Sequence, residues 1–203
     1  MSVRLSPSRR AVLLGGAGAL ALPGLVRAQG QAVRLGILQP VTGALAQDGE
    51  YGRLGAELAI NEINAAGGLR GLGRIEMVFG DARSTPEGGT AEVERMNSEG
   101  VVAVVGGFAS PICLAASQAA SRYDLPYVVD VGVSDQIVSR GLRNTFRFGP
   151  GFGAVTRAAL DNLATLNNAA GRPARTVVVV HEDGLFGSGM ARLMQQELPG
   201  RGF

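Results

Sequence analysis

The sequence predicts an α/β fold with a mostly parallel sheet. Apolar, β-branched runs alternate with longer stretches of helical periodicity, and this alternation is typical of repeated strand–helix units. The run at 101–105 is apolar throughout, as expected for a parallel strand that is buried on both faces. Of the 203 residues, 46% are hydrophobic, so the chain can bury a sizeable core.

The first strand–helix unit is expected over residues 33–68. Its strand covers 33–39 and ends at Pro40, and its helix covers 52–66 and ends at Gly67-Gly68. Apolar positions in this helix follow the spacing i, i+3, i+4, i+7, and polar positions form the opposite stripe. The apolar stripe is Ala56, Ala59, Ile60 and Ile63, and the polar stripe is Arg53, Glu57, Asn61 and Asn64.

Three more units are expected to follow the first. Thr85 and Pro86 favour a helix start, because a hydroxyl caps the first turn and proline suits its first position. Ser110 and Pro111 repeat that pattern. The expected strands are 75–80, 101–105 and 126–131, and the helical segments after them are 84–99, 110–123 and 135–141.

The pattern changes at residues 145–148, where a short strand leads into Gly149-Pro150-Gly151, a predicted hinge or crossover. A helix over 152–167, a buried strand over 175–181 (RTVVVVH) and a helix over 187–198 are expected next. One strand cannot bury itself, so we expect a second lobe that is truncated. The predicted domains are lobe 1 at 29–148, and the hinge with a partial lobe 2 at 149–203.

Residues 1–28 have the features of an export signal. Arg9-Arg10 precedes an apolar run over 11–22, which is too short to span a bilayer, and small residues precede an expected mature start near Gln29. The arginine pair indicates the twin-arginine route, and an ordinary signal with a chance arginine pair is the alternative. Either signal predicts a periplasmic protein.

A second motif in this segment suggests a different class of protein. Residues 16–21 fit G-x-G-x-x-A, the fingerprint of a nicotinamide-dependent oxidoreductase. No acidic residue stands about 20 positions further on, where a ribose partner belongs, and the first acid is Asp48. The sequence therefore disfavours this reading.

Composition argues for binding without catalysis. The 19 basic residues are all Arg; outside 1–28, 15 Arg face 17 acidic residues, so no basic patch indicates a nucleic-acid partner. Cys113 is the only cysteine and is expected to be a small buried side chain, and His181 is the only histidine. No metal-ligand cluster, phosphate loop or nucleophile–base pair is apparent. We therefore expect neither an enzyme, a cofactor nor a metal.

Four loops follow strands and should share the carboxyl edge of the sheet, where open α/β folds bind ligands. Ser110 is the foremost candidate, because it lies at a helix N-terminus that favours a carboxylate, and Ser134 is a second candidate. Asp48 is expected at the mouth of a cleft, and Phe186 could present an aromatic face. The loops are Pro40–Tyr51, Gly106–Ser110, Asp130–Asp135 and Glu182–Gly187.

The ordered motifs resemble a known family. They are LGILQPVTGALAQDG, AINEINAAGG, GDARSTPEGG, GVVAVVGGFAS, LPYVVDVGVS, NTFRFGP and VVVVHEDGLFGSGMA. In this combination the chain resembles the periplasmic solute-binding proteins of branched-chain amino acid ABC transporters, the leucine/isoleucine/valine-binding type. The resemblance implies a type I periplasmic-binding-protein-like fold, in which two parallel-sheet lobes joined by a hinge hold ligand between them. Members of the family are nearly twice as long.

The resemblance also implies binding positions. Relatives hold the ligand's carboxylate with the serine after the GG loop, here Ser110 with Ala109 beside it. They also use an Ala-Thr pair, which is replaced here by Gly132-Val133, with Ser134 next. Phe186 stands where an aromatic residue of the second lobe packs on the ligand, and Asp48 stands where the first loop often has an aromatic residue.

The function implied is a monomeric, extracytoplasmic solute-binding component of an ABC importer that delivers ligand to a membrane permease. The departures at 48 and 132–133 disfavour an aliphatic amino acid. The expected ligand is an amino acid, an aromatic acid, an amide or urea. A ligand-sensing receptor or an amide-responsive regulator of the same fold is the alternative.

Overall fold

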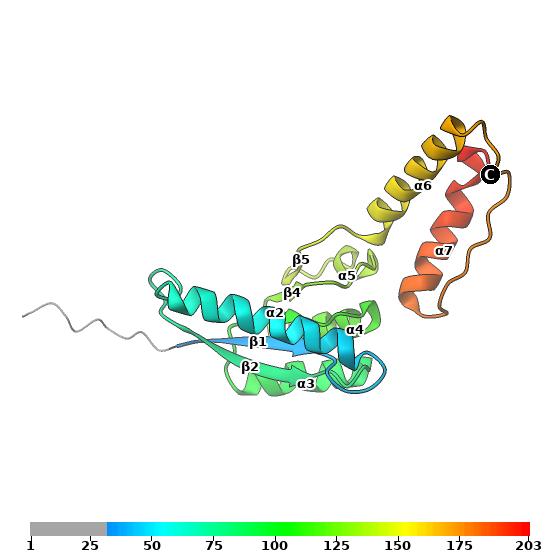
Figure 1. Cartoon of the computed structure of the whole chain (residues 1–203). Helices are drawn as coiled ribbons and strands as arrows, with labels where there is room; N and C mark the ends of the chain where they lie inside the picture. The colour runs from blue at the N-terminus through cyan, green and yellow to red at the C-terminus, as the bar shows by residue number, and fades with distance from the viewer. Residues whose placement is uncertain (1–31) are drawn as a thin grey trace, which may run out of the picture.

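The computed structural model describes residues 32–203 and contains a five-stranded parallel sheet with helices on both faces (Figure 1). The predicted export signal at 1–28 and the 16–21 motif lie outside the described residues. Every neighbouring pair of strands is parallel, in the order β2-β1-β3-β4-β5, which confirms the predicted α/β class. The strands are β1 Val33–Gln39, β2 Ile75–Asp81, β3 Ala103–Gly106, β4 Tyr127–Val129 and β5 Thr145–Arg147.

The helices follow the strands in the predicted alternation up to β5. None of the helices in the described part is long and apolar enough to cross a membrane. They are α2 Ala46–Ala65, α3 Pro86–Ser98, α4 Ser110–Ser121, α5 Gln136–Ser139, α6 Phe152–Ala169 and α7 Leu185–Glu197, with a 3₁₀ turn η1 at Pro199–Arg201.

The sheet separates two apolar clusters. Leu38 of β1 belongs to the larger cluster, with residues of α3, α4 and the neighbouring strands. Ile37, the preceding residue, packs with Ile60 of α2 on the opposite side. This alternation follows from the geometry of a strand, in which successive side chains point to opposite faces. The two faces are therefore covered by different helices (Figure 1).

Two expectations about α2 were wrong. The helix begins at Ala46, so Asp48 lies in its first turn and not in a loop. Asn64 is buried and not part of a solvated stripe. Its amide donates to Ile75 O at 2.9 Å and accepts from Ile75 N at 2.8 Å, satisfying the peptide at the start of β2.

The helix α3 begins as the sequence predicts. Thr85 caps it, with its hydroxyl accepting from Gly88 N at 3.0 Å, and Pro86 occupies the first helical position.

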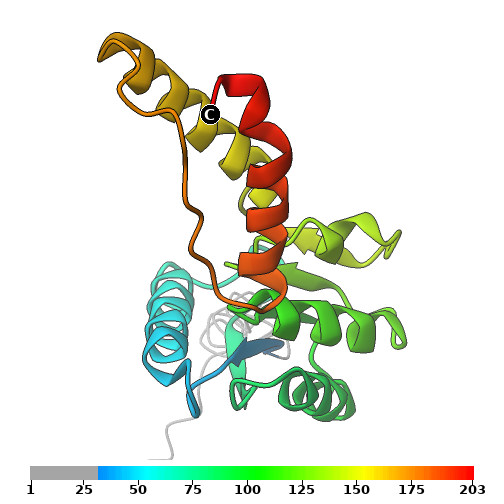
Figure 2. The same ribbon diagram turned by 90° about the vertical axis from the view of Figure 1, so that its right-hand side faces the viewer.

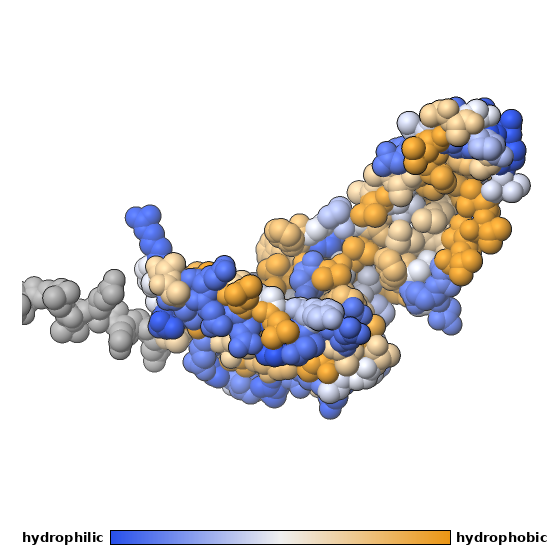
Figure 3. Space-filling model, in the orientation of Figure 1, coloured by the Kyte–Doolittle hydropathy of each residue, from blue (hydrophilic) through white to orange (hydrophobic). Residues whose placement is uncertain are grey.

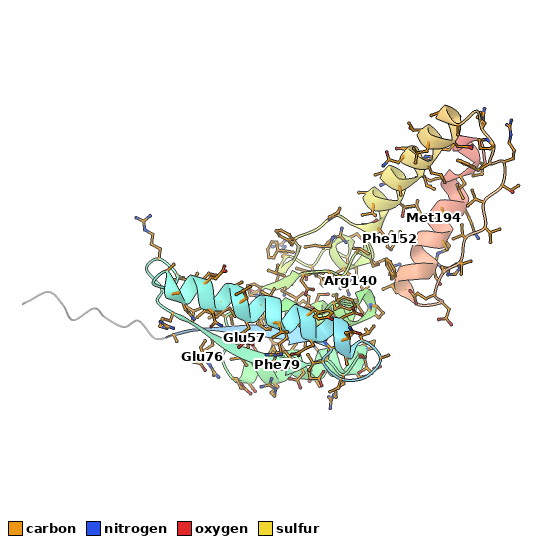
Figure 4. All side chains as sticks on the ribbon, viewed as in Figure 1. Glu57, Glu76, Phe79, Arg140, Phe152 and Met194 are labelled. Carbon is orange, nitrogen blue, oxygen red and sulfur yellow. The ribbon has the colours of Figure 1, made fainter. Side chains whose placement is uncertain are left out.

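The helices α6 and α7 form a separate pair beyond the sheet (Figure 2). Phe152 packs against Gly189 of α7, where an added Cβ would stand 2.8 Å from the ring; Figure 4 labels this residue. Helix α7 also contacts α4. The lower end of α7 in Figure 2 therefore touches the part of the molecule that contains the sheet.

The predicted buried strand at 175–181 is wrong. The segment is irregular and exposed, with Val178 88% and Val180 92% accessible. In the described residues no backbone–backbone hydrogen bond reaches it, because no strand lies beside it. A β-branched run favours an extended chain, but a strand needs a partner for its peptide groups. Figure 3 shows apolar atoms on the outer edge of the α6–α7 pair, where this segment runs.

Candidate functional site

Two of the predicted loops meet at the carboxyl edge of the sheet. Ser134 N donates a hydrogen bond of 3.2 Å to Ser110 Oγ, joining the loop after β4 to the start of α4. Both serines are buried. Although they are 24 residues apart in the sequence, they lie in contact, as the shared edge of parallel strands predicts.

The chemistry of this pair suits an anion. Ser110 is the first residue of α4 and Ala109 is the capping position, so Ser110 is not itself the helix cap as the sequence suggested. The first N–H groups of a helix have no partner within the helix, and its dipole favours negative charge there. Ser134 Oγ is buried and has no hydrogen-bond partner among the described residues. A carboxylate oxygen would satisfy both groups.

Gly132 and Val133 serve the site through their backbones. A Cβ at Gly132 would stand 2.6 Å from Cys113 Sγ, so a larger residue there would displace the loop. Val133 O accepts from Phe152 N at 2.7 Å and from Arg147 Nη1 at 3.2 Å. The loop is therefore tightly packed, and it places Ser134 beside Ser110.

Asp48 and Phe186 are not part of this pair. Asp48 is exposed on α2, and no hydrogen bond in the described chain connects it with Ser110 or Ser134. Phe186 is 42% exposed in the first turn of α7. Because 175–181 is not a strand, the 182–187 loop does not share the edge of the sheet. Both residues remain predictions for the site.

Gln39 and Asp130 support the site and were missed as functional residues. Gln39 ends β1 with 2% exposure, and its Nε2 donates to Asp130 Oδ2 at 2.6 Å. Asp130 Oδ1 accepts from Phe108 N at 3.3 Å and from Val131 N at 2.7 Å. These bonds join the ends of β1 and β4 to the loop before Ser110. In the sequence, a polar residue at the end of a buried strand is the feature that could have indicated Gln39.

The first loop is held by Asp81 at the end of β2. Its carboxylate accepts from Val41 N at 3.0 Å, Thr42 Oγ1 at 2.6 Å and Arg83 N at 2.8 Å. Burial alone would raise the pKa of Asp81, but these hydrogen bonds outweigh it and lower the pKa below its usual value. Ser84 adds a bond from its hydroxyl to Thr42 O at 2.6 Å. These hydrogen bonds therefore fix the first loop at the end of β2.

Cys113 is buried, as the sequence predicts, directly behind the site. Burial, followed by the negative charge of Asp130, raises the pKa of the Cys113 thiol to about 12. Burial also raises the pKa of Tyr127, whose hydroxyl donates to Gly106 O at 3.0 Å. Both groups are therefore neutral at physiological pH.

We predict that iodoacetamide at pH 8 alkylates Cys113 in the folded chain about a thousandfold more slowly than in urea-unfolded chain, because little thiolate forms. Mass spectrometry of quenched samples measures the two rates. Comparable rates would contradict the buried, neutral thiol.

The described residues show a shallow hollow whose lining includes Asp135 but neither Ser110 nor Ser134. It has a volume of about 300 Å³ and lies between α5, α6 and α7, with Asp135, Phe152, Gly153, Arg157 and Arg192 among its lining residues. A second hollow of similar size lies on α3 and α4, away from the serines. Within residues 32–203, no three His, Cys, Asp or Glu side chains gather as metal ligands would.

A parallel sheet with polar loops joined at its carboxyl edge is the architecture of an α/β binding fold. The family model described as Periplasmic binding protein matches residues 32–203, and the chain belongs to that family. This confirms the resemblance seen in the sequence motifs.

Two curated relatives come from Brucella. The chain is 32% identical over 163 residues to Leu/Ile/Val-binding protein homolog 8 of Brucella abortus, covering 78% of this chain and 40% of the relative. It is 33% identical over 164 residues to homolog 7 of Brucella melitensis, covering 79% and 41%. The chain thus spans about two fifths of the length of these relatives.

Solved structures show the same fold. The substrate-binding protein LivJ of Streptococcus pneumoniae, in complex with isoleucine, has a TM-score of 0.74 at 24% identity, covering 82% of this chain and 46% of that one. A solute-binding protein of Rhodopseudomonas palustris, in complex with 3,4-dihydroxy benzoic acid, has a TM-score of 0.72 at 17% identity, covering 84% and 45%.

Proposed function

We propose that this protein is the extracytoplasmic solute-binding component of an ABC importer and works by binding rather than catalysis. The observation that carries the proposal is the contact between Ser110 and Ser134 at the N-terminus of α4. It provides two hydroxyls and a helix N-terminus at one point, and Ser134 Oγ still lacks a partner in the described chain. The ligand's carboxylate would bind there.

The ligand class follows from that chemistry. Isoleucine and 3,4-dihydroxybenzoic acid, the ligands in two related structures, differ in their side groups but share a carboxylate. The serine pair recognises that shared group, so an amino acid or an aromatic acid suits the site better than an amide or urea. A membrane permease would receive the ligand, as expected of this family's importers.

We predict that L-isoleucine or 3,4-dihydroxybenzoate shifts the backbone amide resonances of Ser110 and Ser134 in the ¹⁵N-labelled chain. The reason is that a bound carboxylate accepts hydrogen bonds from the first turn of α4. An NMR titration measures the shifts and registers weak binding. Ser110→Ala should reduce the affinity about tenfold, since it removes one hydrogen bond to a charged group.

Ser121→Ala is the matched control, because Ser121 ends the same helix and, among residues 32–203, its hydroxyl bonds only Gln118. Isoleucinamide, which lacks the carboxylate, should produce no shifts at the serines. Equal responses to the acid and its amide would reject the carboxylate site, and shifts confined to other parts of the chain would reject its location.

A further inference from the structure

Arg147, the last residue of β5, reaches from the sheet into the loop that carries Ser134. Its Nη1 donates to Ser134 O at 2.9 Å and to Val133 O at 3.2 Å, and its Nε donates to Gly149 O at 3.1 Å. Only 11% of the side chain is exposed. One guanidinium therefore joins the loop after β4 to the connection that leads to α6.

Asp135 completes this arrangement from the other side. Its Oδ1 lies 3.3 Å from Arg147 Nη2, and its Oδ2 accepts from Gly153 N at 3.0 Å in the first turn of α6. Phe152 N adds a bond of 2.7 Å to Val133 O. The loop over 132–135 is thus bonded both to the end of β5 and to the start of α6. We call Arg147 and Asp135 together the loop clasp.

Two glycines leave room for the loop clasp. A Cβ at Gly151 would overlap Asp135 Oδ1 and Arg147 Nη2, and a Cβ at Gly153 would stand 2.5 Å from Asp135 Oδ2. Gly151, part of the segment that predicts a hinge, therefore has a packing role together with Gly153. It lets a carboxylate and a guanidinium approach the backbone closely.

We propose that Arg147 and Asp135 are positioning residues for the anion site of Ser110 and Ser134, and that they transmit the orientation of α6 to that site. The proposal rests on the proposed function. Ser134 is the connecting residue, because its N–H bonds Ser110 while its carbonyl bonds Arg147. A shift of α6 relative to the sheet would pull on the same loop that receives the ligand.

The position of the loop clasp agrees with this role. Asp135, Phe152 and Gly153 line the hollow between α5, α6 and α7, while Ser134 faces Ser110 on the sheet side. The loop clasp therefore lies between the anion site and the α6–α7 pair. A planar guanidinium can bond several oxygens in fixed directions, whereas the ammonium of lysine is a point charge without that fork.

The test compares Arg147→Lys and Asp135→Asn with the wild-type chain. Arg140→Gln is the control, because Arg140 bonds Leu114 O and Ser117 Oγ of α4 and none of its hydrogen bonds in the described chain reaches α6; Figure 4 labels it. NMR measures amide hydrogen exchange at Ser134, Phe152 and Gly153, and the same titration with 3,4-dihydroxybenzoate or L-isoleucine gives the affinity. Thermal unfolding reports global stability separately.

Both variants should exchange roughly tenfold faster at Ser134 as well as at Gly153, since the charge-assisted bonds that hold the loop are weakened. The affinity should fall by a similar factor, with a melting temperature close to that of the control. Arg147→Lys should lower the affinity although it keeps the charge, because an ammonium group cannot make the directed hydrogen bonds of the planar guanidinium. Asp135→Asn retains the other bonds of Arg147, so it keeps the test informative if Arg147→Lys folds poorly.

Faster exchange at Gly153 alone, with Ser134 unchanged, would overturn the proposal, because the loop clasp would then act only at α6. Unchanged affinity in both variants, when the wild-type chain binds a probe, would overturn it while leaving the proposed function intact. Faster exchange at Ser134 without any probe binding to the wild-type chain would support the loop clasp and count against the proposed function.

Discussion

Replacing Gly106 by alanine is expected to lower the free energy of unfolding by about 3 kcal/mol and to abolish the ligand-induced shift at Ser110. Gly106 ends β3 with φ +124°, a conformation that L-residues rarely adopt, and a Cβ there would overlap Leu38 O. The next residue, Gly107, donates its N–H to Leu38 O at 2.7 Å. The substitution would therefore separate β3 from β1 just before the loop to Ser110.

Gly100→Ala is the matched control for this substitution. Gly100 has φ +76°, and no atom of the described residues lies within 4 Å of the Cβ that would be added. It thus carries the backbone strain without the overlap and should cost about 1 kcal/mol. Urea unfolding measures both variants. If the two lose equal stability, the close approach of β1 to Gly106 is not what requires glycine there.

The second large effect is expected at Asp81. Asp81→Asn should lower the free energy of unfolding at pH 7 by about 2 kcal/mol, because a charged acceptor of backbone N–H groups becomes a neutral amide. The bonds from Val41, Thr42 and Arg83 that hold the first loop would weaken together. Urea unfolding across a pH series measures the difference between the variant and the wild-type chain.

The direction of the pH dependence follows from the lowered pKa of Asp81. A carboxyl whose pKa is lower in the folded state stabilises the fold fully above its unfolded-state pKa of about 3.9. That contribution is lost as the pH falls through the lower, folded-state pKa. The difference between wild type and Asp81→Asn should therefore be constant above about pH 5 and shrink as the pH falls below about 4.

Asp124→Asn serves as the control, because Asp124 is exposed in the turn before β4. It should change stability by less than about 0.5 kcal/mol. A difference for Asp81→Asn that grows on acidification would contradict the assigned role of its carboxylate.

Much of the sheet and part of the site could be predicted from local patterns. The apolar run that contains β3 and the capping residues Thr85 and Pro86 are local signals, and each predicted its element. Ser110 and Ser134 were found because both follow strands that end at one edge. The start of α2 was predicted wrongly. The helix begins six residues before the expected position, and no capping side chain marks its start in the sequence.

Residues that act through distant partners could not be predicted in this way. Asn64 lies at a position that reads as polar surface, and its role depends on the peptide of Ile75, which only the fold brings close. Nothing in the sequence distinguishes Arg147 from the other arginines. Its bonds to Ser134 and Asp135 depend on the path of the chain around the end of β5. Their function lies in contacts between elements.

By itself the sequence determined the alternation of strands and helices, the parallel sheet and the two serines, because periodicity, capping and strand ends are local properties. Only the tertiary structure decided that Ser134 N meets Ser110 Oγ, that Arg147 holds the same loop, and that 175–181 pairs with no strand of the described residues. The physical reason is that propensity acts within a segment, whereas a hydrogen bond needs a second group at the right place.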